Sequence, residues 1–162
     1  MAFGDGRSCV AALVAIDLAT VGKWAERRNL PYTSFQDLSA RPEVRALVAE
    51  EIRTCNATLQ PSGRIRRFLL VNKEFDADDN EITRTRKIRR RFVAEKYADA
   101  VAALYGEAED VELTTEITYE DGRTGKLKVR LKIADVPDEP DGAKAAVSRA
   151  PTAASAREAV HA

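Results

Sequence analysis

A charged segment from Glu74 to Arg91 concentrates the residues of this chain that could do chemistry. Its first eight residues carry five carboxylates, and its last eight, Arg84 to Arg91, carry six cations. Because burying so much charge in a fold interior is costly, we expect the segment to form an exposed loop that leads into a helix. There it can bind an anionic ligand or simply stay solvated, with the remaining chain as its scaffold.

A calcium-binding loop is the first of three interpretations of this segment. Asp76, Asp78 and Asn80 match positions one, three and five of the EF-hand pattern. The pattern then fails, because Glu81 stands where a glycine is needed and Lys87 where a bidentate glutamate is needed. We therefore predict no metal site here.

A nucleic-acid interface is the second interpretation, since six cations in eight residues could contact phosphates. No aromatic residue is interleaved before Phe92, so bases would find no stacking platform. The whole chain also has a formal net charge of zero, with 26 cations and 26 carboxylates, whereas a general nucleic-acid binder shows a basic excess. We predict no nucleic-acid partner.

The third interpretation is that Lys87 is aimed at an anionic reacting centre. Lysine suits this role as a compact charge on a long flexible stem, and it can stabilise charge that develops on a phosphoryl or acyl oxygen. Thr83 and Thr85 would flank it with hydroxyl donors, in an extended run that holds Lys87 at the tip. From spacing alone, a solvated face that pairs with its own acidic half is an equal alternative.

Length and composition predict one cytoplasmic domain of ordinary size, with 162 residues, 44% hydrophobic and 32% charged. Cys9 and Cys55 lie far apart, and we expect both to be reduced, small core residues. His161 is the only histidine, so neither a histidine-based triad nor a histidine metal site is available. No apolar run approaches the ~20 residues that span a bilayer, and no signal-peptide cleavage site follows the N-terminal apolar stretch.

Hydrophobic periodicity predicts a small α+β fold, in which a short mixed β-sheet packs with about three helices and is followed by a C-terminal β-hairpin. The expected strands are Cys9–Ile16, Arg64–Asn72, Val111–Tyr119 and Lys126–Ile133, the last two joined around Asp121-Gly122. The expected helices run from an Asp17 cap to about Asn29, from Pro42 to Leu59, and from Ile88 to Leu104, where Gly106 ends the third. Residues 137–162 lose all periodicity and are expected to be a disordered tail.

The run ITRTRKIRR, preceded by GRIRRFLLVNKEFDADDNE, resembles the C-terminal signature of AMP-forming long-chain acyl-CoA synthetases, members of the adenylate-forming superfamily. These enzymes carry a Thr-x-Thr-x-Lys segment where other members have Ser-Gly-Lys. The runs GDGR, GKWAERRNLPYTSFQDLS and TYEDGRTG are also similar to that family. The resemblance extends from Gly4 to Val136, which predicts a synthetase C-terminal domain over residues 1–136 and the tail over 137–162.

The resemblance implies a role for one residue. In such enzymes the C-terminal domain is a mobile lid on a large N-terminal domain, and the motif lysine contacts the carboxylate and the α-phosphate while acyl-adenylate forms. The lid then rotates so that the thiol of CoA can attack. Lys87 matches that lysine and is expected to be catalytic, whereas Arg84, Arg86, Arg89 and Arg90 receive no assigned role.

The family's phosphate loop, its Tyr-Gly-x-Thr-Glu segment, its ribose-binding aspartate and its hinge would all precede Gly4 and do not occur in this sequence. We therefore expect the chain alone to hold no cofactor and to form no acyl-CoA, as the lid of a truncated or split long-chain fatty-acid–CoA ligase. ATP with Mg²⁺ and CoA would bind in the complete enzyme, with an N-terminal adenylation domain on another chain as partner. The alternatives are a non-enzymatic module that binds an anionic partner through Arg84–Arg91, and a decayed remnant.

Overall fold

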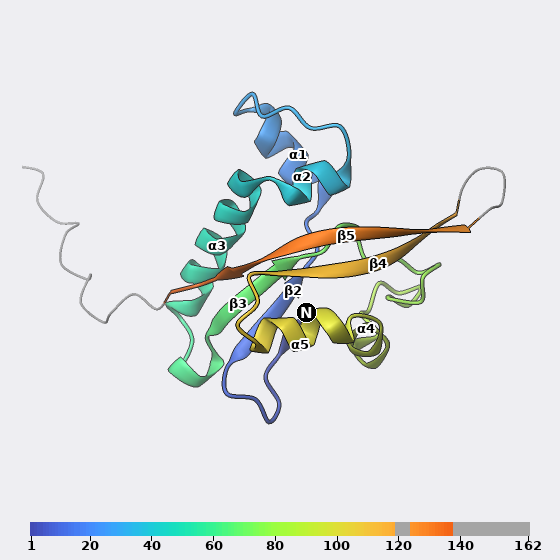
Figure 1. Ribbon diagram of the computed structural model, residues 1–162. Helices are drawn as coiled ribbons and strands as arrows, with labels where there is room; N and C mark the ends of the chain where they lie inside the picture. Colours follow the sequence, from blue (N-terminus) through green and yellow to red (C-terminus); the bar gives the residue numbers. More distant parts are fainter. Residues whose placement is uncertain (119–123, 138–162) are drawn as a thin grey trace, which may run out of the picture.

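Five strands form one mixed sheet in the order β1-β2-β3-β5-β4, and helices cover both of its faces (Figure 1). This computed structural model describes residues 1–118 and 124–137, without the side chains of 115–118 and 124–127. The strands are β1 Ala2–Phe3, β2 Val10–Val14, β3 Ile65–Leu70, β4 Asp110–Thr118 and β5 Thr124–Asp135. β2 and β3 are parallel, whereas the other neighbouring pairs are antiparallel. The predicted α+β class with a mixed sheet is confirmed.

Two groups of helices lie on opposite faces of the sheet, one on the side of α1, α2 and α3 and the other on the side of α4 and α5 (Figure 1). Their bounds are α1 Leu18–Glu26, α2 Phe35–Ala40, α3 Pro42–Asn56, α4 Arg90–Lys96 and α5 Ala98–Tyr105, with a short 3₁₀ turn, η1, at Pro61–Gly63. Among the described residues there are thus five α-helices rather than about three. None of them is long and apolar enough to cross a membrane.

Two of the helix predictions were wrong in detail. No helix was predicted between about Asn29 and Pro42, yet α2 forms there, and Ser34 caps it by accepting a hydrogen bond from the backbone N–H of Asp37 at 3.1 Å. The predicted helix from Ile88 to Leu104 is broken at Tyr97, whose backbone leaves the helical region with φ −104° and ψ 26°. Ile88 itself precedes α4 and is 40% exposed.

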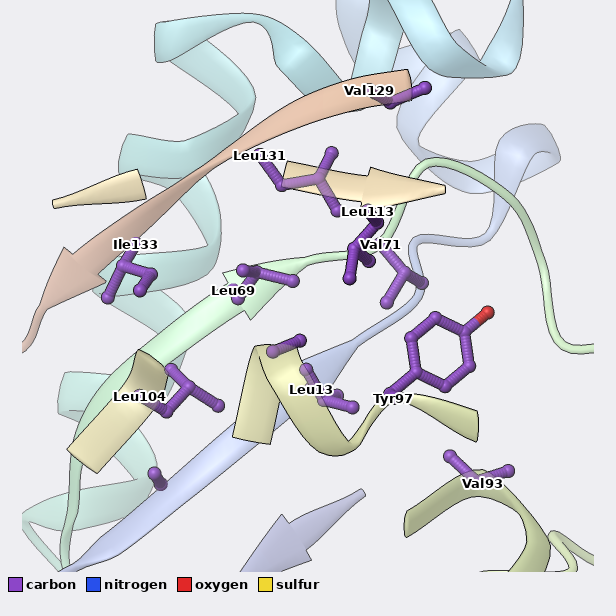
Figure 2. Packing of buried hydrophobic residues seen from close by; sticks show 12 residues of the cluster. Leu13, Leu69, Val71, Val93, Tyr97, Leu104, Leu113, Val129, Leu131 and Ile133 are labelled. Atoms are coloured by element: carbon purple, nitrogen blue, oxygen red, sulfur yellow. The ribbon is translucent and has the colours of Figure 1, made fainter. Parts of the chain in front are cut away.

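The apolar runs of β2 and β3 are buried on both faces, as predicted for central strands. On one face, Leu13, Leu69 and Val71 pack with residues of α4, α5, β4 and β5 (Figure 2). On the other, Ala12, Phe68 and Leu70 pack with buried residues of α1, α2 and α3: Val21, Ala25, Leu38, Val44 and Ile52. Since both clusters depend on β3, this strand is the centre of the fold.

Several residues within the predicted helices lie at the surface of the protein. Leu18 is 39% exposed at the start of α1, and Leu59 is 42% exposed beyond the end of α3. Cys55 is exposed on α3 and Cys9 is only partly buried, so the prediction of two core cysteines was wrong, although both are free. The Asp17 cap of α1 is confirmed, because its side chain accepts a hydrogen bond from the backbone N–H of Thr20 at 2.7 Å.

The predicted C-terminal hairpin joins the main sheet instead of standing apart. β5 pairs with β3 through Arg67↔Asp135, Phe68↔Ala134 and Leu69↔Ile133, while β4 pairs with β5 along nine residues. Val129, Leu131 and Ile133 of β5 are buried in the core cluster that also includes Leu104 of α5. The turn at Asp121-Gly122 and the tail at 138–162 lie outside the described residues.

Arg67 joins three elements where the hairpin meets the sheet. Its guanidinium donates to the backbone oxygens of Leu104 at 3.2 Å and Ala108 at 2.7 Å, and to that of Gly106, at the end of α5. Its Nε lies 2.8 Å from Oδ1 of Asp135 on β5, and only 17% of the side chain is exposed. A cation suits this position because the carbonyls that end a helix carry partial negative charge.

Replacing Arg67 with alanine is therefore expected to lower the free energy of unfolding by about 2–3 kcal/mol, the range for hydrogen bonds to a charged group. Arg130→Ala is the matched control, since its pair with Asp110 spans 3.9 Å between exposed side chains. That variant should change stability by less than about 0.5 kcal/mol. Urea unfolding of both variants checks this, and equal effects would contradict the role given to Arg67.

Candidate functional site

The charged segment forms the loop between β3 and α4, and its basic half folds into a tight hairpin. An isolated antiparallel bridge joins Ile82 to Ile88. Inside it, the backbone N–H of Thr83 donates to the Lys87 oxygen at 2.8 Å, and that of Arg86 donates to the Thr83 oxygen at 2.8 Å. The chain therefore reverses at Arg84-Thr85, and Lys87 begins the returning limb rather than standing at the tip as predicted.

The two threonines shape this hairpin. The Thr83 hydroxyl accepts a hydrogen bond from the backbone N–H of Lys87 at 3.1 Å and lies 3.0 Å from the Thr85 hydroxyl. Arg86, with a φ of 60°, adopts the left-handed conformation that the reversal requires. The Thr83 hydroxyl thus fixes the backbone of Lys87 and contacts the Thr85 hydroxyl, whereas both were predicted to flank Lys87 as hydroxyl donors.

Lys87 and its neighbouring cations are exposed. Every residue from Thr83 to Arg91 belongs to the exposed class. Arg89 donates to the Asn80 side-chain oxygen at 2.9 Å, and Arg91 pairs with Glu95 at 3.0 Å. The ammonium group of Lys87 is therefore accessible to an anionic group brought to this loop.

The acidic half of the segment is held by cations from outside it, a feature that sequence reasoning missed. Glu81 is completely buried. Its Oε1 accepts hydrogen bonds from the Lys96 ammonium at 2.9 Å and the Tyr97 hydroxyl at 2.8 Å. Its Oε2 accepts from the Lys73 ammonium at 2.9 Å and the backbone N–H of Asp76 at 3.1 Å. The four donors satisfy both oxygens of this buried carboxylate.

Asp79 completes a closed group of two carboxylates and two ammonium groups. It pairs with Lys73 and, at 3.2 Å, with Lys96. The charges therefore balance locally, which is the condition under which buried charge is tolerated. The acidic half does not neutralise the basic half, so the alternative of a self-paired solvated face is not what the structure shows.

The electrostatics of this group follow from its contacts. Burial, followed by the hydrogen bond to Glu81, raises the pKa of Tyr97 well above its ordinary range, so the hydroxyl stays a donor. Burial opposes the charge of Lys73, but the hydrogen bonds that its ammonium group donates to Asp79 and Glu81 outweigh burial and raise the Lys73 pKa. The hydrogen bond from Lys73, assisted by Lys96, holds the pKa of Asp79 below its ordinary value.

Acid is expected to weaken this anchoring through Asp79. A carboxyl whose pKa is depressed in the folded protein contributes stability that is complete above its ordinary pKa, here 3.8, and is lost as the pH falls through the lower folded-state value. As the pH falls below about 4, wild type should therefore lose more stability than Asp79→Asn in urea unfolding. Asp78→Asn removes the same charge but leaves the Lys73 and Lys96 pairs intact, so it should retain the wild-type acid slope. Identical slopes for wild type and Asp79→Asn would contradict the assignment.

Other residues of the loop serve structural contacts. Glu74 accepts a hydrogen bond from the backbone N–H of Leu18 at 3.1 Å and so links the loop to the start of α1. The Asp76 side chain accepts from the backbone N–H of Asp78. Among the described residues, no group of three or more His, Cys, Asp or Glu side chains is arranged to hold a metal ion.

A signal for the buried anchor was present in the sequence but was not used. Lys73 and Lys96-Tyr97 flank the charged segment on either side, shortly after the end of β3 and at the end of α4. Because the loop must return from the sheet to the helix, its flanking residues come together at its base. Lys73 and Lys96 could therefore have been predicted to form ion pairs with carboxylates of the acidic half.

Comparison with known proteins shows the family to which the chain belongs. Residues 1–109 match the family described as AMP-binding enzyme C-terminal domain, so the match includes the Lys87 loop and ends before β4. The extension of the resemblance to Val136 therefore stays a prediction. No solved structure matches the chain.

Similar proteins include one from Mycobacterium tuberculosis that is named as the fatty-acid–CoA ligase fadD11. It is 37% identical to this chain over 105 residues, which cover 65% of this chain and 18% of the relative's own length. The long-chain-fatty-acid–CoA ligase FadD15 of the same species is 30% identical over 103 residues, 63% of this chain and 17% of its own length. The peroxisomal long chain acyl-CoA synthetase 6 of Arabidopsis thaliana is 27% identical over 108 residues, 65% of this chain and 15% of its own length. The chain thus spans less than a fifth of each of these relatives, and it belongs to the family of AMP-binding enzyme C-terminal domains.

Proposed function

We propose that this chain acts as the C-terminal lid of an AMP-forming long-chain fatty-acid–CoA ligase, with Lys87 as its catalytic residue. The observation that carries the proposal is an exposed lysine on a hydrogen-bonded hairpin, whose base is fixed to the fold by the buried Glu81. The hairpin lies within the residues that match the family, and similar proteins are named as fatty-acid–CoA ligases.

Lys87 would act as a positive charge at the reacting centre. During acyl-adenylate formation a carboxylate oxygen attacks the α-phosphorus of ATP and pyrophosphate leaves, so charge builds on phosphoryl oxygens. An ammonium group held beside them stabilises that charge more in the transition state than in the ground state. In the described part of the chain, the exposed cations of Arg84–Arg91 carry the positive charge that complements the phosphates of ATP. The binding of ATP with Mg²⁺, fatty acid and CoA is assigned to the complete enzyme.

The partner that this lid requires is an N-terminal adenylation domain. Lys87 can act only when a substrate is held against it, because positioning supplies much of the catalytic effect. We also assign the chain to the cytoplasm, where thiols stay reduced, because both cysteines are free.

The experiment is an assay of AMP and acyl-CoA formation from long-chain fatty acid, ATP, Mg²⁺ and CoA. It compares three samples: this chain, the adenylation domain of a related ligase without its own lid, and the two together. Product is expected only from the mixture. Product from this chain alone would overturn the need for a partner, and a mixture no faster than the adenylation domain would overturn the lid role.

A second candidate is a non-enzymatic module that binds an anionic partner. It is favoured by the pairing of Glu81 and Asp79 with Lys73 and Lys96, which leaves the exposed cations of the hairpin without neutralisation by the acidic half. Binding to heparin that weakens steeply with salt and is unchanged in Lys87→Ala would support this candidate. Loss of binding through Lys87 alone would contradict it.

A further inference from the structure

The buried carboxylate of Glu81 is the least expected group in the loop. A glutamate with no exposed surface loses its hydration, and only close donors can offset that loss. Lys73 lies three residues after the end of β3, and Lys96 and Tyr97 lie at the end of α4 and in the break after it. The Tyr97 ring lies in the core with Val71 and Val93 nearby, and its hydroxyl points away from that cluster (Figure 2). Glu81 therefore ties the loop to both the sheet and the helices.

The backbone of Glu81 is also the base of the Lys87 hairpin. Its carbonyl oxygen accepts a hydrogen bond from the backbone N–H of Arg89 at 2.8 Å. The next residue, Ile82, forms the bridge to Ile88, and Thr83 pairs with Lys87. Contacts that hold Glu81 in place therefore also hold the outgoing limb, Ile82-Thr83. Through these pairs they hold the returning limb, 87–89, as well.

Apolar packing contributes little to holding this hairpin. Residues 83–91 are exposed, Ile88 is 40% exposed, and Ile82 is only partly buried. A hairpin of this size is at best marginally stable by itself in water. The anchor at its base must therefore be polar, and Glu81 is its fully buried member.

We propose that Glu81 is a positioning residue that, through Lys73, Lys96 and Tyr97, orders the hairpin so that Lys87 is presented in one orientation. This inference rests on the function proposed above for Lys87. In the absence of the anchor, the lysine would sample many positions, and the fraction of lids with a correctly placed ammonium would fall. The effect on catalysis is then on the rate of adenylate formation rather than on fatty-acid binding.

The first test compares Glu81→Gln with Glu95→Gln in the full chain by amide hydrogen exchange. Glu95 is an exposed glutamate paired with Arg91, so its replacement removes one charge near the loop and leaves the buried group intact. In Glu81→Gln, exchange at the amides of Thr83, Arg86, Lys87 and Arg89 is expected to rise about 10- to 100-fold, as for loss of charge-assisted hydrogen bonds. Amides of β2 and β3 should keep their wild-type exchange, and Glu95→Gln should match wild type throughout.

A milder variant covers the case in which Glu81→Gln does not fold. Tyr97→Phe keeps the ring, which meets Phe75 edge-on at 6.2 Å, and removes only the hydroxyl that donates to Glu81. Hairpin exchange should rise about 5- to 10-fold in this variant. Unchanged hairpin exchange in Tyr97→Phe and Glu81→Gln would overturn the proposal, as would unprotected hairpin amides in wild type.

The second test uses the mixture with an adenylation domain. Glu81→Gln should lower kcat for adenylate formation about 10-fold with an unchanged KM for fatty acid. It should leave thioester formation from preformed acyl-adenylate at the wild-type rate, whereas a simple loss of folded lid would slow both steps. A full adenylation rate despite a loosened hairpin would overturn the positioning role. An inactive wild-type mixture would instead overturn the proposed function, and the exchange comparison would still decide whether Glu81 orders the hairpin.

Discussion

Replacing Lys87 with alanine is expected to lower the rate of acyl-adenylate formation by about 10²- to 10³-fold in the mixture with an adenylation domain. That is the usual effect of removing one preorganised group that stabilises transition-state charge. Because the Lys87 side chain is exposed, stability should change by less than about 0.5 kcal/mol. The rate loss would therefore belong to chemistry and not to unfolding.

Two comparisons make the Lys87 result decisive. Lys23→Ala removes an exposed lysine of α1, outside the hairpin, and should keep the wild-type rate. Thioester formation from preformed acyl-adenylate should also be nearly unchanged in Lys87→Ala, since the lysine is assigned to the first half-reaction. A wild-type rate of adenylate formation in Lys87→Ala would remove Lys87 from the mechanism.

Replacing Phe68 with alanine is expected to destabilise the fold by about 3–5 kcal/mol, the range for removing a buried phenylalanine. Phe68 is completely buried on β3, where it packs with Leu38, Val44 and Ile52 beneath α2 and α3. Parallel pairing with Ala12 and antiparallel pairing with Ala134 hold its backbone from both sides. The sheet therefore has little freedom to collapse around the cavity that the truncation leaves.

Urea unfolding measures the loss, with Leu59→Ala as its matched control. Leu59 is 42% exposed beyond the end of α3, so its truncation should cost less than about 1 kcal/mol. Since total stability of a domain this size is about 5–15 kcal/mol, Phe68→Ala should remain folded at low temperature but unfold at clearly lower urea. A midpoint equal to that of Leu59→Ala would show that β3 is not the centre of the core.

The elements that the sequence predicted well are those with long, regular apolar patterns. The strands around Leu13 and Leu69 are continuous apolar runs because both of their faces are buried, and the helix from Pro42 shows the helical period because one of its faces is buried. α2 has only six residues, too few for a period, and the break at Tyr97 interrupts an otherwise helical pattern. That break allows Tyr97 to contribute its ring to the core and its hydroxyl to Glu81, a tertiary demand that local propensity does not record.

The candidate site was predicted only in part, because some of its contacts also depend on the tertiary fold. The Lys87 loop was evident from composition and resemblance, whereas burial of Glu81 depends on residues that meet only in three dimensions. From sequence alone, five closely spaced carboxylates indicate a solvated surface. In the structure, Lys73 and Lys96 form ion pairs with two of them, Asp79 and Glu81. Likewise, the position of Lys87 after the reversal depends on the left-handed Arg86, a conformation that is uncommon for arginine.

The pairing of β5 with β3 also bears on the solubility of the chain. Edge strands rich in apolar residues template pairing between molecules, which leads to aggregation. β5 occupies the edge of β3 at Phe68-Leu69, and the sheet then ends at β4, where the exposed Glu112 and Thr114 replace that apolar run. The family match stops at residue 109, so β4 and β5 lie beyond it, yet they cover the apolar edge of β3. A chain cut at the end of the family match would therefore expose that edge to pairing with other molecules.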